Sequence, residues 1–388
     1  MEAIVIIGTG MAGYGLLREL RKLDKETPVT LITADDGAAY AKPNLSNALA
    51  AGKTPEQLQS QSAEQIGASL NARILTQTQV QGIDVAARQV IASQGVVPYS
   101  RLVLAMGADP FAHGVQGAAA QRILSVNDLA DYRAFREALD GKRSVTILGG
   151  GLIGCEFAND LAAAGYQVTV VHRGPYPLER LLPQEIAQTL GMALEQAGVQ
   201  WRYERLATTA EPRGDAIALT LDDGSVVTSD VVLSAIGLRP RTALAAAAGI
   251  ATGRGIIVDR WLQTNVADVY AIGDCAEVAG LVLPYVQPLL QQVRALAATL
   301  TSTMGAQPTP VAYPAMPVAV KTPALPVTVA PPPVAASGAW RVAAQEGCLV
   351  ARFEDAGQLL GFALGGQAPS LRLALTKLLP PVLPPVQS

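Results

Sequence analysis

Two segments of the chain repeat one pattern, an apolar run that ends on closely spaced glycines. The segment at 4–13 reads IVIIGTGMAG, and the segment at 144–154 reads SVTILGGGLIG. Uninterrupted apolar runs of four or five residues, rich in β-branched side chains, are typical of parallel strands that are buried on both faces. Both segments therefore predict an inner strand that runs into a glycine loop.

Helical periodicity follows each glycine loop. Leucines at helical spacing predict a first helix over about 11–23, and a second helix is expected over about 152–164, where Gly165 is a typical C-terminal cap. Further β-branched runs predict a strand after each helix, at 29–33 and 167–171. The two segments thus predict the same unit of strand, glycine loop, helix and strand.

This unit is typical of a dinucleotide-binding fold. The first glycines permit a tight turn and a close approach of the backbone to a pyrophosphate, and the helix N-terminus offers unpaired N–H groups to the anion. One G-x-G-x-x-G pattern also occurs in ordinary turns, but two in one chain, each with the expected flanking elements, favour two nucleotide sites. We expect the loops to bind through Gly8, Thr9, Gly10, Met11, Ala12 and Gly13, and through Gly149, Gly151, Leu152, Ile153 and Gly154.

The residues after the two predicted second strands differ in charge. Asp35 lies 22 residues after Gly13, the spacing of a carboxylate that binds an adenosine ribose, although Asp35-Asp36-Gly37 also fits a simple turn. The second unit has His172-Arg173 18 residues after Gly154. A cation there would pair with the additional phosphate of NADPH, and an ordinary basic pair at the surface is the alternative.

The rest of the chain predicts short strands around the two units. They are expected within 74–83, at 89–91 and at 99–107, then in a hairpin over 216–228 and in the run SDVVLSAIG at 229–237. Prolines become frequent from Pro308 onward, which favours edge strands and loops. We predict an α/β protein with two Rossmann-like dinucleotide-binding domains and a small α+β carboxy-terminal domain.

Composition and charge narrow the function. The chain has 388 residues, enough for two or three domains, and a net charge of −3, which disfavours nucleic-acid binding. Its three cysteines are far apart and its two histidines are too few for a multi-histidine metal site, so cofactor chemistry is favoured over a metal centre. No run reaches the roughly 18 apolar residues of a membrane span, and no secretion signal begins the chain, so we expect no membrane insertion and a cytoplasmic location.

Several motifs together resemble a known family, the FAD-dependent pyridine-nucleotide oxidoreductases. They occur in the family's order over nearly the whole chain: the first glycine loop, YAKPNLS at 40–46, LAMG at 104–107, GGGLIGCEFANDL at 149–161, AIGLRP at 235–240 and YAIGDCA at 270–276. The resemblance implies a first FAD-binding segment at 1–110, an inserted NAD(P)H-binding domain at 111–237, the rest of the FAD domain at 238–307 and an interface domain at 308–388.

The resemblance also implies roles for residues outside the glycine loops. Val80 would meet the adenine through its backbone, Asp274 would hold the ribitol and pyrophosphate region, and Glu156 would lie where the nicotinamide stacks on the flavin. Asp274 could instead cap the segment that follows it. The remaining cofactor-binding residues implied are Ala34, Asp35, Lys42, Pro43, Ala105, Gly107, Gly237, Val286 and Lys321.

Two of these assignments have a physical argument of their own. A helix that begins near Val286, with Pro288 in its first turn, would aim free N–H groups at the negative charge that reduced flavin gathers. Lys42 and Lys321 near the ring would favour the reduced form, although Lys321 could also be a lysine that reaches the surface. No amino-acid side chain is expected to act as a catalytic acid or base, because hydride and electron transfer take place at the flavin.

Within the family, the sequence resembles the bacterial reductases of rubredoxin through ITADDG at 32–37, GCEFANDL at 154–161 and VKTPALP at 320–326. The segment 40–53 has no cysteine, so the thiol chemistry of many relatives is disfavoured. The resemblance implies that FAD takes hydride from NADH, with NADPH left open, and passes single electrons to rubredoxin, which supplies alkane hydroxylase. We expect a monomer or weak homodimer.

Two other functions stay open. A reductase of a [2Fe-2S] ferredoxin for a monooxygenase is the nearest alternative, but such relatives usually have a lysine after the serine of the Pro-x-Leu-Ser phrase at 43–46, where this chain has Asn47. A flavoprotein scaffold that senses NADH, similar to apoptosis-inducing factor, is the alternative of another class. It would be reoxidised slowly by every carrier.

Overall fold

A five-stranded parallel sheet forms the centre of the first lobe in the computed structural model, which describes residues 3–301 and 308–386. The lobe draws on two distant parts of the chain, because its last strand comes from beyond residue 260. The central strand, Ile4–Ile7, is apolar and buried along its whole length, and Leu102, Val103 and Leu104 of the strand beside it are buried too, as is typical of parallel sheets. The strand order is β21 (Val269–Ala271), β9 (Arg101–Leu104), β1 (Ile4–Ile7), β2 (Val29–Ile32) and β5 (Arg73–Leu75).

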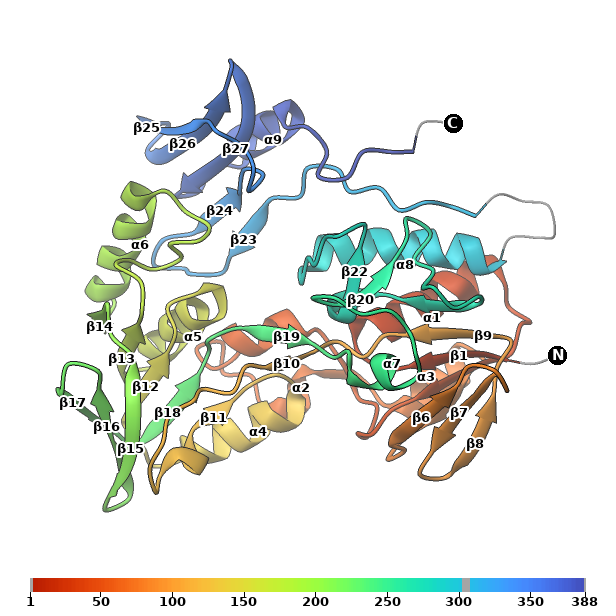
Figure 1. Cartoon of the computed structure of the whole chain (residues 1–388). Helices are drawn as coiled ribbons and strands as arrows, with labels where there is room; N and C mark the ends of the chain where they lie inside the picture. The colour runs from red at the N-terminus through yellow and green to blue at the C-terminus, as the bar shows by residue number, and fades with distance from the viewer. Residues whose placement is uncertain (1–2, 302–307, 387–388) are drawn as a thin grey trace.

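A second parallel sheet of five strands forms the neighbouring lobe (Figure 1). It repeats the arrangement of the first sheet, with the strand that precedes the glycine loop at its centre. The strand order is β11 (Leu124–Ser125), β18 (Val231–Ser234), β12 (Ser144–Leu148), β13 (Gln167–His172) and β14 (Val199–Tyr203). The two sheets and the fold class agree with the expected pair of Rossmann-like units.

An antiparallel ribbon of β10 (Ala108–Pro110) and β19 (Leu238–Pro240) connects the two lobes. Two of the predicted domain boundaries, at 110/111 and 237/238, fall at this ribbon, where the chain enters and leaves the second lobe. The third boundary, at 307/308, adjoins residues 302–307, which lie outside the described residues, as do residues 1–2 and 387–388. The boundaries themselves stay predictions.

The third lobe is an antiparallel sheet that packs on the second lobe (Figure 1). Val320, Val327 and Ala363 belong to the same buried apolar cluster as the inner strands of the second lobe. Helix α9 (Pro369–Leu378) packs on the sheet through Leu371 and Leu375. The strand order is β23 (Val318–Val320), β24 (Val327–Ala330), β27 (Gln358–Gly365), β26 (Cys348–Asp355) and β25 (Ala339–Gln345).

Two glycine loops lead into the helices that matter most for the site. Helix α1 (Met11–Leu23) buries its leucine stripe against β-strands and against α8 (Val286–Thr301), and α5 (Leu152–Ala163) is buried along most of its length. The other helices are α2 (Pro55–Leu58), α3 (Ala63–Ser69), α4 (Leu129–Ala138), α6 (Gln184–Gln196) and α7 (Ala243–Ala247), with 3₁₀ turns η1 (Lys42–Asn47), η2 (Ala120–Arg122) and η3 (Gly273–Cys275).

Small antiparallel sheets complete the two nucleotide lobes. The predicted hairpin over 216–228 is present as two strands joined by a tight turn. The antiparallel sheets comprise β6 (Val80–Asp84), β7 (Gln89–Ala92) and β8 (Gly95–Pro98); β15 (Ala207–Arg213), β16 (Ala216–Leu221) and β17 (Val226–Ser229); and β3 (Ala39–Tyr40) and β4 (Gln59–Gln61). A further small sheet is parallel and pairs β20 (Ile256–Val258) with β22 (Ala276–Val278).

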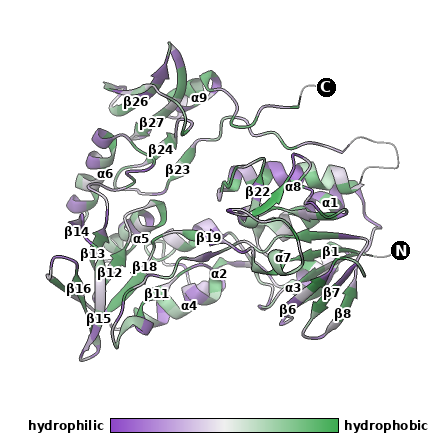
Figure 2. Ribbon diagram, viewed as in Figure 1, coloured by the Kyte–Doolittle hydropathy of each residue, from purple (hydrophilic) through white to green (hydrophobic). Residues whose placement is uncertain are grey.

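Apolar residues concentrate in the strands at the centre of the lobes, whereas outer helices such as α4 and α6 mix polar and apolar residues (Figure 2). Among the described residues, no helix has both the length and the apolar character needed to cross a bilayer. The apolar excess of the chain is therefore accounted for, in the described part, by its buried clusters.

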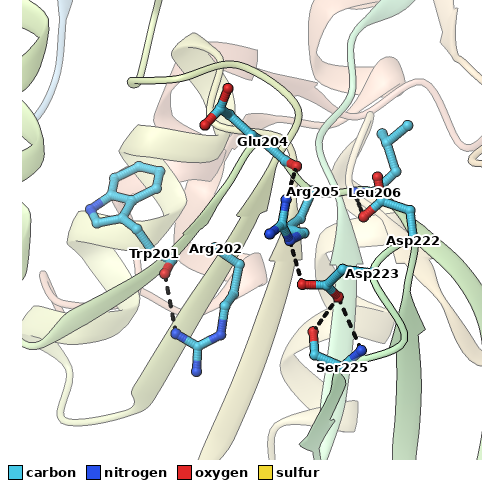
Figure 3. Close-up of polar contacts among 8 residues, drawn as sticks. All are labelled: Trp201, Arg202, Glu204, Arg205, Leu206, Asp222, Asp223 and Ser225. Carbon is cyan, nitrogen blue, oxygen red and sulfur yellow. Dashed lines mark hydrogen bonds and ion pairs between the residues drawn. The ribbon is translucent and has the colours of Figure 1, made fainter.

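Polar contacts anchor the β16–β17 turn to the segment that follows β14 (Figure 3). The Arg205 Nε donates to the Asp223 carboxylate over 2.5 Å, and Leu206 N donates to Asp222 Oδ1 over 3.2 Å. The Ser225 backbone N–H and hydroxyl both donate to Asp223 Oδ1, at 3.0 and 2.6 Å. Since Arg205 N also donates to the His172 carbonyl over 3.1 Å, this turn helps to fix the end of β13.

These contacts predict a pH dependence for the turn. Hydrogen bonds from Ser225, and then the Arg205 guanidinium, lower the pKa of Asp223 to about 2. A carboxyl group with a depressed pKa in the folded state stabilises that state above its unfolded pKa, and the contribution is lost as the pH falls from about 3.8 to about 2. In the variant Ser225→Ala we expect a higher pKa of Asp223, measured by NMR titration of the carboxyl carbon. An unchanged pKa would contradict the assigned cause.

Candidate functional site: two nucleotide loops and a buried ion pair

The first glycine loop is packed so closely that it leaves no room for side chains at two of its glycines. A Cβ at Gly8 would lie 2.3 Å from the Ala105 carbonyl oxygen, and Gly8 has a φ of +113°. A Cβ at Gly13 would lie 2.0 Å from the Gly8 carbonyl oxygen. The first glycine thus permits the turn, and the last one lets α1 approach β1 closely.

The second loop has the same geometry. A Cβ at Gly149 would lie 2.6 Å from the Ala235 carbonyl oxygen, and one at Gly154 would lie 1.9 Å from the Gly149 carbonyl oxygen. Gly149 has a φ of +106°, again in the region that glycine favours. The repeated pattern in the sequence is therefore a repeated packing arrangement, with α5 and β12 in the places of α1 and β1.

The middle glycines face open space at the helix ends. A Cβ at Gly10 or Gly151 would meet no atom within 4 Å. Both residues are N-caps without a side-chain cap, and neither helix has an acidic residue in its first turn. Each helix end thus presents unpaired N–H groups and the positive end of its dipole to an open cradle. This geometry fits the pyrophosphate of one dinucleotide in each lobe.

Asp35 is exposed at the carboxyl end of β2, where a ribose carboxylate is expected. Its Oδ1 accepts hydrogen bonds from the Thr33 hydroxyl over 2.6 Å and from Gly37 N over 2.9 Å. The turn interpretation and the ribose interpretation are therefore compatible, because these bonds fix the carboxylate through one oxygen. Ala34, the residue before it, is exposed beside it. Both stay predicted binding residues.

His172 differs from the cation expected at the end of β13. It is buried, and both of its ring nitrogens are occupied within the protein. Gly150 N donates to Nδ1 over 3.0 Å, while Nε2 lies 2.8 Å from Glu179 Oε2 and 3.1 Å from the Tyr176 carbonyl oxygen. Of the predicted His172-Arg173 pair, therefore, Arg173 is the residue whose charge could still meet the additional phosphate of NADPH, and it is exposed. The sequence could not show this, because Glu179 reaches His172 through the fold of the intervening loop.

A buried ion pair joins all three lobes. The Lys321 Nζ lies 2.9 Å from Glu156 Oε2, and the side chain of Glu156 is 0% exposed. The Lys321 N–H donates to Glu156 Oε1 over 2.9 Å, and the Ser46 hydroxyl donates to Oε2 over 2.5 Å. Lys321 Nζ also donates to the Pro43 carbonyl and, over 3.2 Å, to the Ser46 hydroxyl oxygen. Three of the predicted residues, Pro43, Glu156 and Lys321, are thereby brought together.

Lys42 occupies a second charged position beside η1. Its Nζ donates to Asn127 Oδ1 over 2.7 Å, and Asn127 in turn donates to the Ala108 carbonyl over 2.9 Å. Burial lowers the pKa of Lys42, and attraction by Asp274 opposes this shift. Burial raises the pKa of Asp274, and Lys42 opposes that shift. The charges of these two predicted residues therefore interact with each other.

Helix α8 begins at Val286, as predicted, and is tied to the loop that carries Asp274. Gln292, 3% exposed, accepts a hydrogen bond from Gly273 N over 2.6 Å and donates to the Tyr313 hydroxyl over 2.8 Å. The signal in the sequence for this role is a glutamine among the mostly apolar residues of the helix's buried face.

The remaining predicted residues are placed around the loops. Ala105 and Gly107 follow β9, and the Ala105 N–H donates to the Ile7 carbonyl over 2.9 Å. Gly107 and Gly237 have φ values of +69° and +114°, and Val80 begins β6. The sequence did not predict that Asn127 contacts Lys42 or that Ser46 contacts Glu156, because neither residue stands out in the sequence by its type or spacing.

The three cysteines are free and buried. Burial raises the pKa of Cys155, and it raises the pKa of Cys275 to about 11. Thiols of this kind stay protonated near neutral pH and make poor nucleophiles. Cys348 lies in β26, with its Sγ 3.1 Å from the Gln345 carbonyl oxygen. The cysteines thus offer no thiol pair for electron transfer, in agreement with the sequence argument.

Comparisons with known proteins fit this geometry. Residues 2–299 match the family model described as pyridine nucleotide-disulphide oxidoreductase, and residues 310–379 match a model described as rubredoxin binding C-terminal domain. The chain is 47% identical to a rubredoxin-NAD(+) reductase of Alcanivorax borkumensis, over 99% of this chain and 100% of that one. It is also 47% identical to a rubredoxin-NAD(+) reductase of Acinetobacter baylyi, over 99% of both chains.

A solved structure gives the same result for the fold. The ferredoxin reductase for the CYP199A2 system from Rhodopseudomonas palustris superposes with a TM-score of 0.87 at 27% identity, over 96% of this chain and 93% of that one. The two glycine cradles agree with these matches, which cover nearly the whole chain. The chain belongs to the pyridine nucleotide-disulphide oxidoreductase family.

Proposed function

We propose that this chain is an NADH-dependent rubredoxin reductase with FAD in its first lobe. The observation that carries the proposal is the match of residues 310–379 to a rubredoxin binding domain, in a chain that shares 47% identity with rubredoxin-NAD(+) reductases over its whole length. When bound, FAD supplies the ability to accept a hydride and to release electrons singly. Reduced rubredoxin would in turn serve alkane hydroxylation in a cytoplasmic electron-transfer chain.

The chain's own residues support this chemistry by position and charge. The Gly10 and Gly151 loops bind the two pyrophosphates at helix ends, which fixes the two nucleotides relative to one another. Lys42 and Lys321 supply positive charge near the predicted flavin position, and Glu156 holds Lys321 in place. We infer that these lysines stabilise the reduced cofactor, because its added negative charge is lower in energy beside a cation.

The domain that matches a rubredoxin binding module contributes directly to this cluster. Lys321 lies just after β23, in the third lobe, yet its side chain reaches Glu156 of the second lobe and Ser46 of the first. A partner bound on the third lobe would therefore sit on the same lobe that supplies Lys321 to the predicted cofactor site. This favours direct transfer of electrons to a bound carrier rather than relay through a thiol.

Rapid mixing with purified carriers tests the acceptor. The FAD-loaded protein is reduced with NADH without oxygen and then mixed with rubredoxin or, separately, with a [2Fe-2S] ferredoxin. We expect rubredoxin to reoxidise it at least tenfold faster. Ferricyanide reduction is the control for the hydride step. Fast reoxidation by ferredoxin alone would show that ferredoxin, and not rubredoxin, is the electron acceptor. Slow reoxidation by both carriers would favour the NADH-sensing scaffold.

The ferredoxin alternative stays a second candidate because of one observation. A ferredoxin reductase has the same fold over 96% of this chain, with a TM-score of 0.87. Its 27% identity is well below the 47% shared with the rubredoxin-NAD(+) reductases. Asn47 also stands where ferredoxin reductases usually have a lysine, which favours rubredoxin.

A further inference from the structure

A carboxylate from a later loop lies at the end of β13, although the residues at the end of this strand, His172 and Arg173, are not acidic. NADH-binding folds usually carry an acidic residue at the end of this strand, where it binds the adenosine ribose, but here the strand ends at His172. The side chain of Glu179 fills the place, with its Oε2 2.8 Å from His172 Nε2. A Cβ at Gly174 would lie 2.8 Å from the Glu179 carboxyl carbon. The carboxyl group thus reaches back to the strand end from seven residues further along.

The loop that carries Glu179 is fixed to the glycine loop. Leu178 N donates to the Gly150 carbonyl over 2.9 Å, and the side chain of Leu178 is 2% exposed. Leu178 has a φ of +56°, a conformation that costs energy for a branched side chain and persists only where its surroundings hold it. Glu179 is therefore presented at a fixed place beside the second nucleotide cradle.

His172 orients this carboxylate. Because Gly150 N–H donates to Nδ1, that nitrogen carries no proton, and the ring proton is on Nε2, from which it is donated to Glu179 Oε2. The ring thus supplies a hydrogen bond rather than a charge for a phosphate. Glu179 Oε1 accepts no hydrogen bond from residues 3–301 or 308–386, and the nearest cation is Arg180 Nε at 4.0 Å. The side chain is 24% exposed, so Oε1 is free to accept from a ligand.

We propose that Glu179 binds the adenosine ribose of NADH and selects it over NADPH, with His172 as its positioning residue. Two ribose hydroxyls can donate to an acceptor-only carboxylate, whereas the 2′-phosphate of NADPH would meet its negative charge. The inference rests on the proposed use of NADH. It reverses the preference for NADPH that the His172-Arg173 pair suggests in the sequence alone.

The test compares Glu179→Gln with Glu185→Gln, which removes the same charge from an exposed position in the first turn of α6. Calorimetry on the FAD-loaded proteins gives Kd values for NAD⁺ and NADP⁺, and NADH or NADPH oxidation with ferricyanide gives KM and kcat. In E179Q we expect NAD⁺ binding to weaken roughly tenfold or more, as for a lost charged hydrogen bond. The ratio of kcat/KM for NADH to that for NADPH falls with it, while kcat with saturating NADH stays within twofold.

His172→Asn tests the positioning role, because asparagine can still accept from Gly150 N–H but cannot reach Glu179. We expect a higher KM for NADH at unchanged kcat, a split that general unfolding would not produce. An NADH-to-NADPH ratio within twofold of wild type in E179Q overturns the proposal, as does an equal loss in E185Q. Because ferricyanide replaces the protein acceptor, failure with rubredoxin would count against the proposed function and leave this inference standing.

Discussion

Alanine at Gly13 is expected to give a folded but colourless protein. Its Cβ would lie 2.0 Å from the Gly8 carbonyl oxygen and 3.0 Å from the Gly8 carbonyl carbon, and both are backbone atoms that cannot turn away. Helix α1 would have to move off β1, and its N-terminal N–H groups would leave the position in which they face a pyrophosphate. We expect loss of FAD, measured as the flavin absorbance per protein after purification and after reconstitution.

Gly15→Ala is the matched control for this variant. Gly15 lies two residues further along the same helix, and its Cβ would be 3.5 Å from a methyl group of Val293, an ordinary contact. Alanine in a helix interior is also favoured over glycine, by about 0.5–1 kcal/mol. We therefore expect G15A to bind FAD as the wild type does. A colourless G15A would show that any added side chain on α1 releases FAD, and would contradict the close-approach argument.

The equivalent change in the second lobe should separate the two nucleotides. A Cβ at Gly154 would lie 1.9 Å from the Gly149 carbonyl oxygen, so Gly154→Ala disturbs the second cradle and leaves the first intact. We expect a yellow protein whose reduction by NADH is slowed at least roughly a hundredfold, the effect of losing about 3 kcal/mol of binding. Dithionite should still reduce it. Loss of FAD from G154A would show that the cradles are not independent.

The features that the sequence predicted well are local ones. The first helix was expected over 11–23 and is present over those residues, and the second ends at Ala163, one residue before the expected position. Strand, loop and helix follow from neighbouring residues, because each is set by apolar spacing and by glycines within one turn. The hairpin at 216–228 follows from its turn residues for the same reason.

The contacts that were missed join residues far apart in the chain. Ser46 and Glu156 are 110 residues apart, and Lys321 and Glu156 are 165 apart. A motif can place each of them near a cofactor, but only the packing of three lobes shows that they bind one another. At His172 the sequence position matches a cation site, but the ring nitrogens form hydrogen bonds with Gly150 and Glu179 of the same chain. Residue type and spacing do not reveal which partner a side chain already has.

Lys321→Met is expected to be the most destabilising change in the buried ion pair. It removes the cation from a carboxylate whose side chain is 0% exposed, so Glu156 would be left buried without a counter-ion. Removing one partner of a buried pair costs about 3–5 kcal/mol. Glu156→Gln should cost less, because the side chain of Lys321 is 33% exposed and its ammonium group can reach water.

The asymmetry between the two partners is the measurable signature. We expect the urea concentration that releases FAD, followed by flavin fluorescence, to fall much further in K321M than in E156Q. The double variant E156Q/K321M should recover part of the loss, since it leaves no buried charge. Lys377→Met, an exposed lysine of α9 in the same lobe, is the control and should leave the midpoint unchanged. Equal losses in K321M and E156Q would mean that Glu156 is solvated when Lys321 is removed, which its complete burial argues against.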